Sequence, residues 1–422
     1  MALESLADII PLIFLLVVWL LISIIWEKTG RNRGALRIYP LVIIYRSATL
    51  KKLIQRIGKK YSNFWRRLGV IADKVFMFVM GGGALYITLN AITLILGSYF
   101  EFVGVPIGSR FVVVIPFVTM PMNKILVFML AGFVLAIILH ELFHGVVSVA
   151  ENRNIKSAGI IISLGIGGGF VEPDIEDELQ AVIDSMETNT ARDNIRKYCK
   201  ASPHNLDTKT ILRKFRRIVA AGMLANLILM LMFAGTLFGL GALKAYENYG
   251  LKIVQIDKNS PAQKYGLRVG DIIIMLAGQR VRTISDFQNT LSKLYPGANV
   301  SFLVLRNGTK IELFVVLAEK NGKAYIGVLI QQYIKSNIPI ISDDAMFDMY
   351  YFLYINALLE FLVVIINVLP IFFLDGSQWL NSLLIEKYGR RGLRIGMTIS
   401  IIITLIFILN FIAPSFASFL VQ

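Results

Sequence analysis

The chain has 422 residues, of which 56% are hydrophobic, and its mean hydropathy is +0.65. This composition excludes an ordinary soluble protein and indicates a polytopic α-helical membrane protein. The formal net charge of +15 would suit a nucleic-acid-binding protein, but no aromatic and basic module of that kind accompanies it, so we expect no nucleic-acid partner.

The apolar runs predict about six transmembrane helices, at about 9–26, 70–97, 123–149, 217–243, 350–374 and 395–420. The first run lacks a basic segment ahead of it and a small-residue cleavage site, so we interpret it as a retained span.

Thirteen Lys or Arg residues lie between Lys28 and Lys74, against a single acidic residue. This bias predicts a cytoplasmic loop that contacts anionic lipid headgroups of the bilayer. Within it, Leu50–Trp65 is typical of a basic amphipathic helix on the membrane surface. Alternation of spans then places 150–216 and 385–394 inside the cell and 98–122 and 244–349 outside.

A His-Glu-x-x-His pattern, His140 to His144, lies near the end of the third apolar run. Two histidines four residues apart share one helix face, which suits two ligands of one zinc ion. Glu141 between them would stand beside a zinc-bound water. His140 is some 17 residues from the outer start of its helix, or roughly 25 Å at 1.5 Å per residue, so we expect the site in the cytoplasmic half of the bilayer.

The next segment, Ala158–Val171, is apolar and rich in glycine but too short to span as a helix. A strand or a re-entrant hairpin fits it better, and such backbone is tolerated at membrane depth only where protein or a water-filled cavity covers it. An apolar loop on the protein surface is the alternative.

The composition changes between about Gly250 and Gln332, where short alternating strands and one helix, Ile284–Leu294, are separated by turn signals. The stretch Ser260–Ile273 resembles the core signature of PDZ domains of the permuted bacterial type. Such a fold binds an extended peptide or a chain end by adding it to a sheet edge. A β-rich spacer between two spans is the alternative.

Two histidines leave a catalytic zinc short of a third protein ligand. Asp375 is expected to end the apolar helix that descends from outside over 350–374, and so to reach about the same depth as His140. An ionisable group at that depth is costly unless it is paired or bound to metal. A helix-terminal Asp facing the cytoplasm would need no special role.

The motifs HELFHG and NVLPIFFLDG, together with the PDZ-like insert, resemble the site-2 protease family of intramembrane zinc metalloproteases, in its archaeal and eukaryotic branch. The resemblance covers about Lys124 to Leu384 and includes the segment that ends in Asn226. Phe372, Phe373, Ser377 and Met223 depart from the bacterial pattern, which bears on loop shape and leaves every ligand intact.

The resemblance implies that Zn²⁺ is bound by His140, His144 and Asp375, with Glu141 as general base. Asn226 would donate a hydrogen bond to the oxyanion or hold the substrate, or else serve helix packing. Gly169 and Phe170 would lie in a strand that pairs with an unwound substrate. Asn367 is grouped with them as a substrate-binding residue, and it would support Asp375 or serve packing. No role is assigned to Glu360.

We therefore expect a protease that cleaves single-span membrane proteins, located in the cell membrane with the active site toward the cytoplasm and the PDZ-like domain outside. A membrane-anchored PDZ adaptor with a vestigial metal site is the alternative, and a transporter is disfavoured because the halves of the chain show no repeat. The expected parts are the N-terminal spans (1–122), two halves of the catalytic membrane core (123–243 and 336–422) and the PDZ-like domain (244–335).

Overall fold

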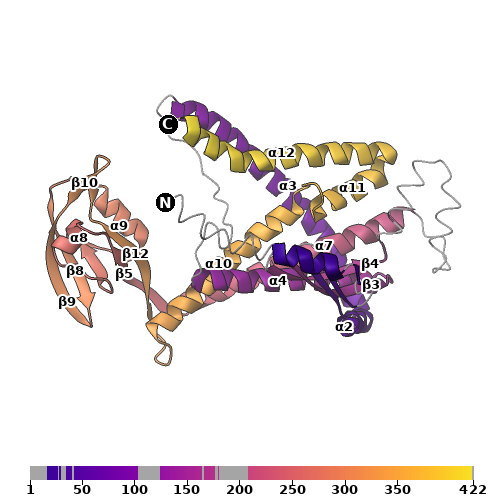
Figure 1. The fold of residues 1–422 in the computed structure, drawn as a ribbon, viewed down its shortest axis with the longest axis horizontal. Helices are drawn as coiled ribbons and strands as arrows, with labels where there is room; N and C mark the ends of the chain where they lie inside the picture. Colours follow the sequence, from indigo (N-terminus) through magenta and orange to yellow (C-terminus); the bar gives the residue numbers. More distant parts are fainter. Residues whose placement is uncertain are drawn as a thin grey trace. The chain divides into compact units, whose positions relative to one another are not determined.

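The computed structural model describes residues 17–26, 28–29, 35–39, 42–102, 124–163, 166–175, 179 and 208–420. The chain divides into two compact units (Figure 1). A helical unit comprises Met1–Met232 and Ile355–Gln422, and a β-rich unit comprises Phe233–Tyr354. Two long helices contribute residues to both units.

Among the described residues, five helices are long and apolar enough to cross a membrane, and they correspond to five of the six predicted spans. They are α3 (Ser62–Phe102), α4 (Lys124–Ala150), α7 (Thr208–Ala242), α10 (Asp343–Val368) and α12 (Arg390–Leu420). The predicted first span is described only as a short apolar helix, Val17–Trp26, and its first half lies outside the described residues.

The basic amphipathic segment forms helix α2 (Ala48–Lys60), and α3 begins at Ser62 after a break at Tyr61. Ser47 caps α2, since its hydroxyl accepts a hydrogen bond from the Leu50 amide at 3.1 Å. The apolar side of α2 packs on the second half of α4, where Ile54 is 1% exposed in a cluster with Val146 and Val149. Protein, not lipid, therefore covers this part of its apolar face.

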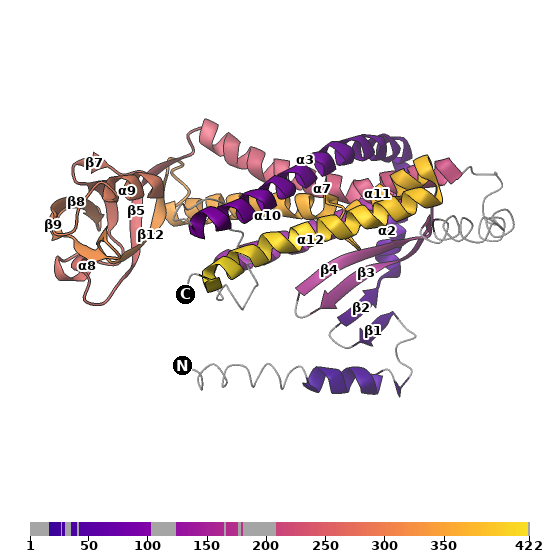
Figure 2. The ribbon, with the colours of Figure 1, turned by 90° about the horizontal axis from the view of Figure 1, so that it is seen from above.

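A four-stranded antiparallel sheet accompanies these helices, with strand order β1-β2-β3-β4 (Figure 2). The strands are β1 (Leu36–Tyr39), β2 (Val42–Arg46), β3 (Ile155–Ser163) and β4 (Ile166–Pro173). The hairpin β3–β4 confirms the strand prediction for the glycine-rich segment. β4 is at one edge of the sheet and lies against α4: a Cβ built on Gly168 would be 2.8 Å from a methyl carbon of Ile137.

The predicted span 350–374 begins and ends earlier in the structure, where α10 starts at Asp343 and ends at Val368. Pro370 cannot donate a backbone hydrogen bond, and the residue before a proline is disfavoured in helical conformation. A new helix, α11 (Asp375–Tyr388), begins after this break. Asp375 therefore opens the first turn of α11 and does not end the span, which corrects the prediction.

The largest core of the helical unit joins five helices, α3, α4, α7, α10 and α11. The stacked rings of Phe76 on α3 and Trp379 on α11 have centroids 5.3 Å apart. Val364 of α10 and Met223 of α7 belong to the same buried cluster. This packing brings α7, α10 and α11 together around the end of α4 that carries the His-Glu-x-x-His pattern.

The β-rich unit has a six-stranded sheet with order β12-β5-β6-β8-β9 and β7 paired to β6. Its strands are β5 (Tyr246–Ile256), β6 (Ile272–Leu276), β7 (Gln279–Arg280), β8 (Asn299–Arg306), β9 (Thr309–Val316) and β12 (Val328–Ser336), and β10 (Ala318–Lys320) pairs with β11 (Lys323–Tyr325). Helices α8 (Pro261–Lys264) and α9 (Ile284–Leu291) complete it. The expected strands and single longer helix are all present.

Candidate metal centre

The two histidines of the pattern face the same side of α4. The rings of His140 and His144 are edge to face with centroids 4.6 Å apart, and each side chain is 12% exposed. Their Nε2 atoms are 3.0 Å apart. The helical spacing therefore gives the arrangement that the sequence predicts.

Asp375 reaches both rings from α11. Its Oδ2 atom is 3.1 Å from His140 Nε2 and 3.3 Å from His144 Nε2. These three atoms form a group that could hold a metal ion. Two helices separated by more than 200 residues of sequence thus supply one cluster.

The chemistry of the three atoms fits a tetrahedral cation. Asp375 Oδ2 is buried and has no hydrogen-bond partner among the described residues. Bonds of about 2.0–2.1 Å from zinc to nitrogen or oxygen imply about 3.3 Å between neighbouring tetrahedral ligands. The observed separations of 3.0–3.3 Å are close to that value. Three lone pairs directed at one point call for a shared positive charge.

Groups on α7 orient both imidazoles. His144 Nδ1 is 2.7 Å from the carbonyl oxygen of Ile218, to which it donates a hydrogen bond, so Nε2 is left with its lone pair. The Asn226 side-chain amide lies 3.3 Å from His140 Nδ1 and is 1% exposed. An imidazole that binds metal through one nitrogen donates its other N–H in this way.

Gly222 of α7 provides the space in which the rings lie. A Cβ at this position would be 2.4 Å from His144 Nε2 and 2.7 Å from His140 Cε1. Contacts shorter than about 3 Å between such atoms are repulsive. Only glycine allows the helix backbone to lie this close to both histidines.

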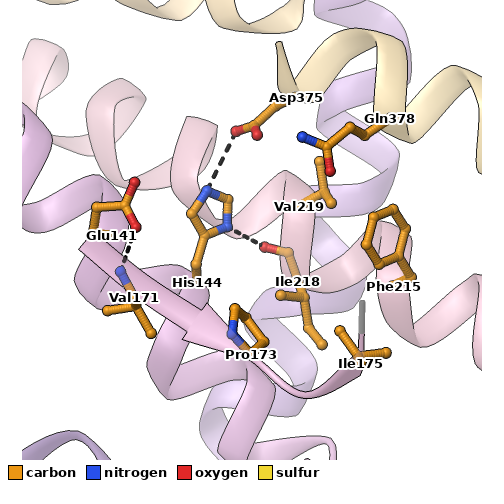
Figure 3. Close-up of a pocket in the computed structure, with 10 residues that line it drawn as sticks. All are labelled: Glu141, His144, Val171, Pro173, Ile175, Phe215, Ile218, Val219, Asp375 and Gln378. Atoms are coloured by element: carbon orange, nitrogen blue, oxygen red, sulfur yellow. Dashed lines mark hydrogen bonds and ion pairs between the residues drawn. The ribbon is translucent and has the colours of Figure 1, made fainter. Parts of the chain in front are cut away.

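Glu141 points to the same cavity and is held by strand β4. Its Oε2 accepts a hydrogen bond of 2.9 Å from the Val171 amide, and Figure 3 shows the carboxylate beside His144 and Asp375. The pocket is lined by Glu141, His144, Val171, Pro173, Ile175, Phe215, Ile218, Val219, Asp375 and Gln378. A carboxylate next to three convergent ligand atoms can accept a proton from a water molecule in the pocket.

The backbone conformation of the segment between α10 and α11 positions Asp375 next to the histidines. Phe373 has φ +71°, a left-handed conformation that costs a non-glycine residue about 1–2 kcal/mol. A Cβ on Gly376 would be 2.1 Å from the carbonyl oxygen of Leu369, so this position also requires glycine. Backbone strain of this kind is concentrated at functional sites.

An ionic network holds the neighbouring helices, and no sequence pattern indicates it. Arg216 of α7 contacts Glu386 of α11 at 2.6 Å and Asp73 of α3 at 3.6 Å, and Asp73 accepts a 2.7 Å hydrogen bond from Trp379. Burial raises the pKa of Glu386, but hydrogen bonds and charges from Arg216 and Arg213 outweigh it and hold that pKa below its usual value.

The remaining predicted site residues do not contact the three ligand atoms. Gly169 and Phe170 are in β4, and a Cβ on Gly169 would be 3.7 Å from Glu141 Cβ. Asn367 is half-buried in the last turn of α10 and is not among the residues that line the pocket. The hydrogen-bonding groups that sequence analysis missed, the Val171 amide and the Ile218 carbonyl, are backbone atoms, which no residue type reveals.

Comparison with known families gives one match that covers most of the chain: the model of Peptidase family M50 matches residues 128–409. An uncharacterized protein of Methanocaldococcus jannaschii is 25% identical over 398 residues, which are 93% of this chain and 91% of that protein.

Shorter matches concern a single module. A probable periplasmic serine endoprotease of Chlamydia muridarum, described as DegP-like, is 38% identical over 76 residues, or 18% of this chain and 15% of the endoprotease. The PDZ domain of an SdrC-like protein of Listeria innocua is 23% identical, with a TM-score of 0.19, and covers 20% of this chain and 96% of that domain. The chain thus spans only about a sixth of the length of such endoproteases.

Proposed function

Because this chain belongs to peptidase family M50, and is therefore a peptidase of a polytopic membrane family with a PDZ-like domain, we propose that it is a zinc metalloendopeptidase. Its substrates would be single-span membrane proteins, cut within or near the transmembrane segment. The observation that carries the proposal is the convergence of His140, His144 and Asp375 within 3.0–3.3 Å between helices of a membrane protein.

Two imidazole nitrogens and one carboxylate oxygen form a donor set that suits zinc and leaves one position for water or substrate. Bound there, zinc would polarise the scissile carbonyl and acidify a water molecule. The Ile218 carbonyl and Asn226 would keep both Nε2 atoms directed inward. The geometry supports this orienting role for Asn226, and a hydrogen bond from Asn226 to the oxyanion stays a prediction.

Glu141 would move the proton. Its Oε2 is fixed by the Val171 amide, which leaves Oε1 to accept a proton from water and to deliver it to the leaving amine. One hydrogen bond also limits rotation of the carboxylate, so the side chain would be held ready for this transfer.

The substrate would pair with strand β4. Val171 donates its amide proton away from β3, to Glu141, so by the strand alternation Gly169 also directs its backbone groups to the outer edge of the sheet. An unwound transmembrane segment has free backbone groups that such an edge satisfies. Gly169 would thus bind substrate backbone. Phe170, whose backbone groups face β3 by the same alternation, would contact the substrate only through its side chain, and Asn367 would support this end of α10.

We further propose that the active site faces the cytoplasm and that the PDZ-like domain lies outside, where it binds a peptide or a chain end. The excess of basic residues between Lys28 and Lys74 supports this orientation through the positive-inside rule.

The test is cleavage by the purified protein, reconstituted into lipid vesicles with a single-span membrane protein and zinc. Glu141→Gln should lower the rate by about 10²–10⁴-fold, the range for loss of a general base, and leave the bound zinc in place. Glu172→Gln is the matched control, because that carboxylate belongs to strand β4, next to Val171, but accepts its hydrogen bond from Ser157. Cleavage that persists in Glu141→Gln or after chelation of zinc would contradict the proposal.

A further inference from the structure

Glu360 of α10 is a buried acid to which the proposed mechanism gives no role. Its side chain is 0% exposed, and neither carboxylate oxygen has a hydrogen-bond partner among the described residues. It lies within one of the helices apolar enough to span a membrane. A carboxyl group without a partner is costly in such surroundings, so its presence indicates an interaction beyond the protein's own side chains.

The depth of Glu360 follows from a contact between α4 and α10. A Cβ on Gly132 would overlap the Asn356 side chain, so the two helices touch there. From this contact the sequence of α4 and that of α10 both continue toward the metal centre, where His140 and Asp375 meet. Glu360 is one step of four residues beyond the contact, about 6 Å, and His140 is two such steps, about 12 Å. Glu360 therefore lies roughly one helical turn from the level of His140.

The side of α10 that carries Glu360 faces the interior between α4 and α7. Residues 356, 360 and 364 are four apart, and each step of four turns by about 40°. Asn356 touches α4, and Val364 belongs to the buried cluster that includes Met223 of α7. The opposite face of α10 packs toward α3 and α12 through Ile365, and Leu369, just after the helix, joins the same cluster. Glu360 thus lies between the contact with α4 and the buried cluster to which α7 contributes.

Asn226 places a complementary group in this interior. When His140 Nε2 faces a metal, Nδ1 carries the ring proton and donates it, so the amide of Asn226 must present its oxygen to His140. The other atom of the amide is then the NH₂ group. That second position is buried and has no hydrogen-bond partner among the residues the structure describes. An unpaired donor on α7 and an unpaired carboxyl group on α10 are therefore both within about a turn of His140.

We propose that one internal water molecule joins Asn226 to Glu360 and that Glu360 is a positioning residue for the metal centre. The water accepts a hydrogen bond from the Asn226 amide and donates one to the Glu360 carboxyl group, as buried waters do for otherwise unpaired polar groups. Through Asn226, this chain of hydrogen bonds fixes the tautomer and ring orientation of His140. The inference rests on the proposed function, in that it takes His140 to be a metal ligand.

The test measures the stability of the metal-free protein and its affinity for Co²⁺, whose visible spectrum reports on the coordination. Glu360→Leu should raise the melting temperature without metal, because it removes a buried carboxyl group, and should weaken Co²⁺ binding about tenfold, as loss of a group that supports a ligand does. Asn226→Ala should weaken Co²⁺ binding to a similar extent, and the double variant should be no weaker than either. Glu360→Gln, which keeps a hydrogen-bonding side chain, should stay within about twofold of wild type.

Asn356→Ala is the matched control, since it removes a buried polar side chain one turn farther from the metal centre and should leave Co²⁺ affinity unchanged. Wild-type Co²⁺ affinity and spectrum in Glu360→Leu, or additive losses in the double variant, would overturn the inference. A fall in both stability and affinity in Glu360→Leu would also overturn it, because that result marks general structural support. A wild-type protein that binds Co²⁺ but cleaves no membrane substrate would overturn the proposed function alone.

Discussion

In the β-rich unit, the buried carboxylate of Asp271 accepts hydrogen bonds from the Arg268 amide at 2.8 Å and from the Arg306 guanidinium at 2.7 Å. Among residues 233–354, all of which the structure describes, no buried side-chain nitrogen or oxygen lacks a hydrogen-bond partner. In the helical unit, buried atoms of Asn226, Glu360 and Asp375 do lack one. Unsatisfied buried groups are rare in folded proteins, and these three belong to the proposed metal centre or to the helix that precedes Asp375.

The largest effect should come from a change at Asp375, because it takes away one of the three convergent ligand atoms that distinguish the helical unit from the β-rich unit. Asp375→Ala should weaken zinc binding more than about 100-fold, beyond the 10–100-fold typical of a supporting residue, and abolish proteolysis. Isothermal titration with zinc checks the first effect and the vesicle assay checks the second. Gln378→Ala, which changes another residue of the same pocket and helix, should bind zinc normally.

A metal centre whose affinity did not change in Asp375→Ala would require a different ligand set. Asp375 could be identified as a candidate from the depth of its span, but its place at the start of α11 could not. The break at Pro370 and the left-handed Phe373 depend on packing of the segment, for example the 3.0 Å hydrogen bond from the Phe372 amide to Thr404.

A smaller effect should follow a change at Gly222, which tests the space around the imidazoles. Gly222→Ala places a methyl group 2.4 Å from His144 Nε2, so we expect both rings to move and proteolysis to fall by about 10- to 100-fold. The rate of cleavage at saturating zinc is the measurement. Gly235→Ala is the control: Gly235 is on the same helix, but a Cβ there would have no neighbouring atom within 4 Å. This variant should leave the rate unchanged.

Equal rates for Gly222→Ala and the wild type would mean that the histidines do not need the close approach of α7. In the sequence, Gly222 belongs to the run of small residues before Asn226, which indicates close helix packing. The sequence alone does not reveal that the backbone of α7 lies against the two rings.

A substitution in the β-rich unit should lower the stability of that unit and leave cleavage nearly unchanged. Asp271→Ala removes the carboxylate that pairs with Arg306, which keeps only its hydrogen bond to the Gly266 carbonyl. The free energy of unfolding of this unit should fall by about 3 kcal/mol, as expected when one member of a largely buried ion pair is removed. Thermal unfolding followed by circular dichroism measures this change. Cleavage should change less than about twofold, since the metal ligands belong to the other unit.

The control for Asp271→Ala is Asp344→Ala, whose carboxylate is 85% exposed and 3.7 Å from Lys252, and it should have little effect on unfolding. A loss of zinc binding in Asp271→Ala would show that the two units are energetically coupled, against our expectation. The strands and the turns of this unit follow from local alternation and turn residues, which is why the sequence predicted them well. Which polar groups of the two units are buried, and which of them are paired, depends on tertiary packing and cannot be predicted from the sequence.

The smallest effect at neutral pH concerns Glu386. Because its pKa is lower in the folded protein than its usual value, the stability it contributes is present at neutral pH and is lost as the pH falls through the folded pKa. Glu386→Gln should therefore flatten the acid side of the curve of melting temperature against pH. An acid limb identical to that of the wild type would show that the contacts with Arg216 and Arg213 contribute nothing.

The most direct test of the metal centre is X-ray absorption at the zinc edge on the purified wild-type protein. We predict one zinc per chain, with four ligands at about 2.0–2.1 Å that include two imidazoles, and loss of the imidazole signal in His140→Ala/His144→Ala. A protein that takes up no zinc, or a zinc shell without imidazole, would contradict the account.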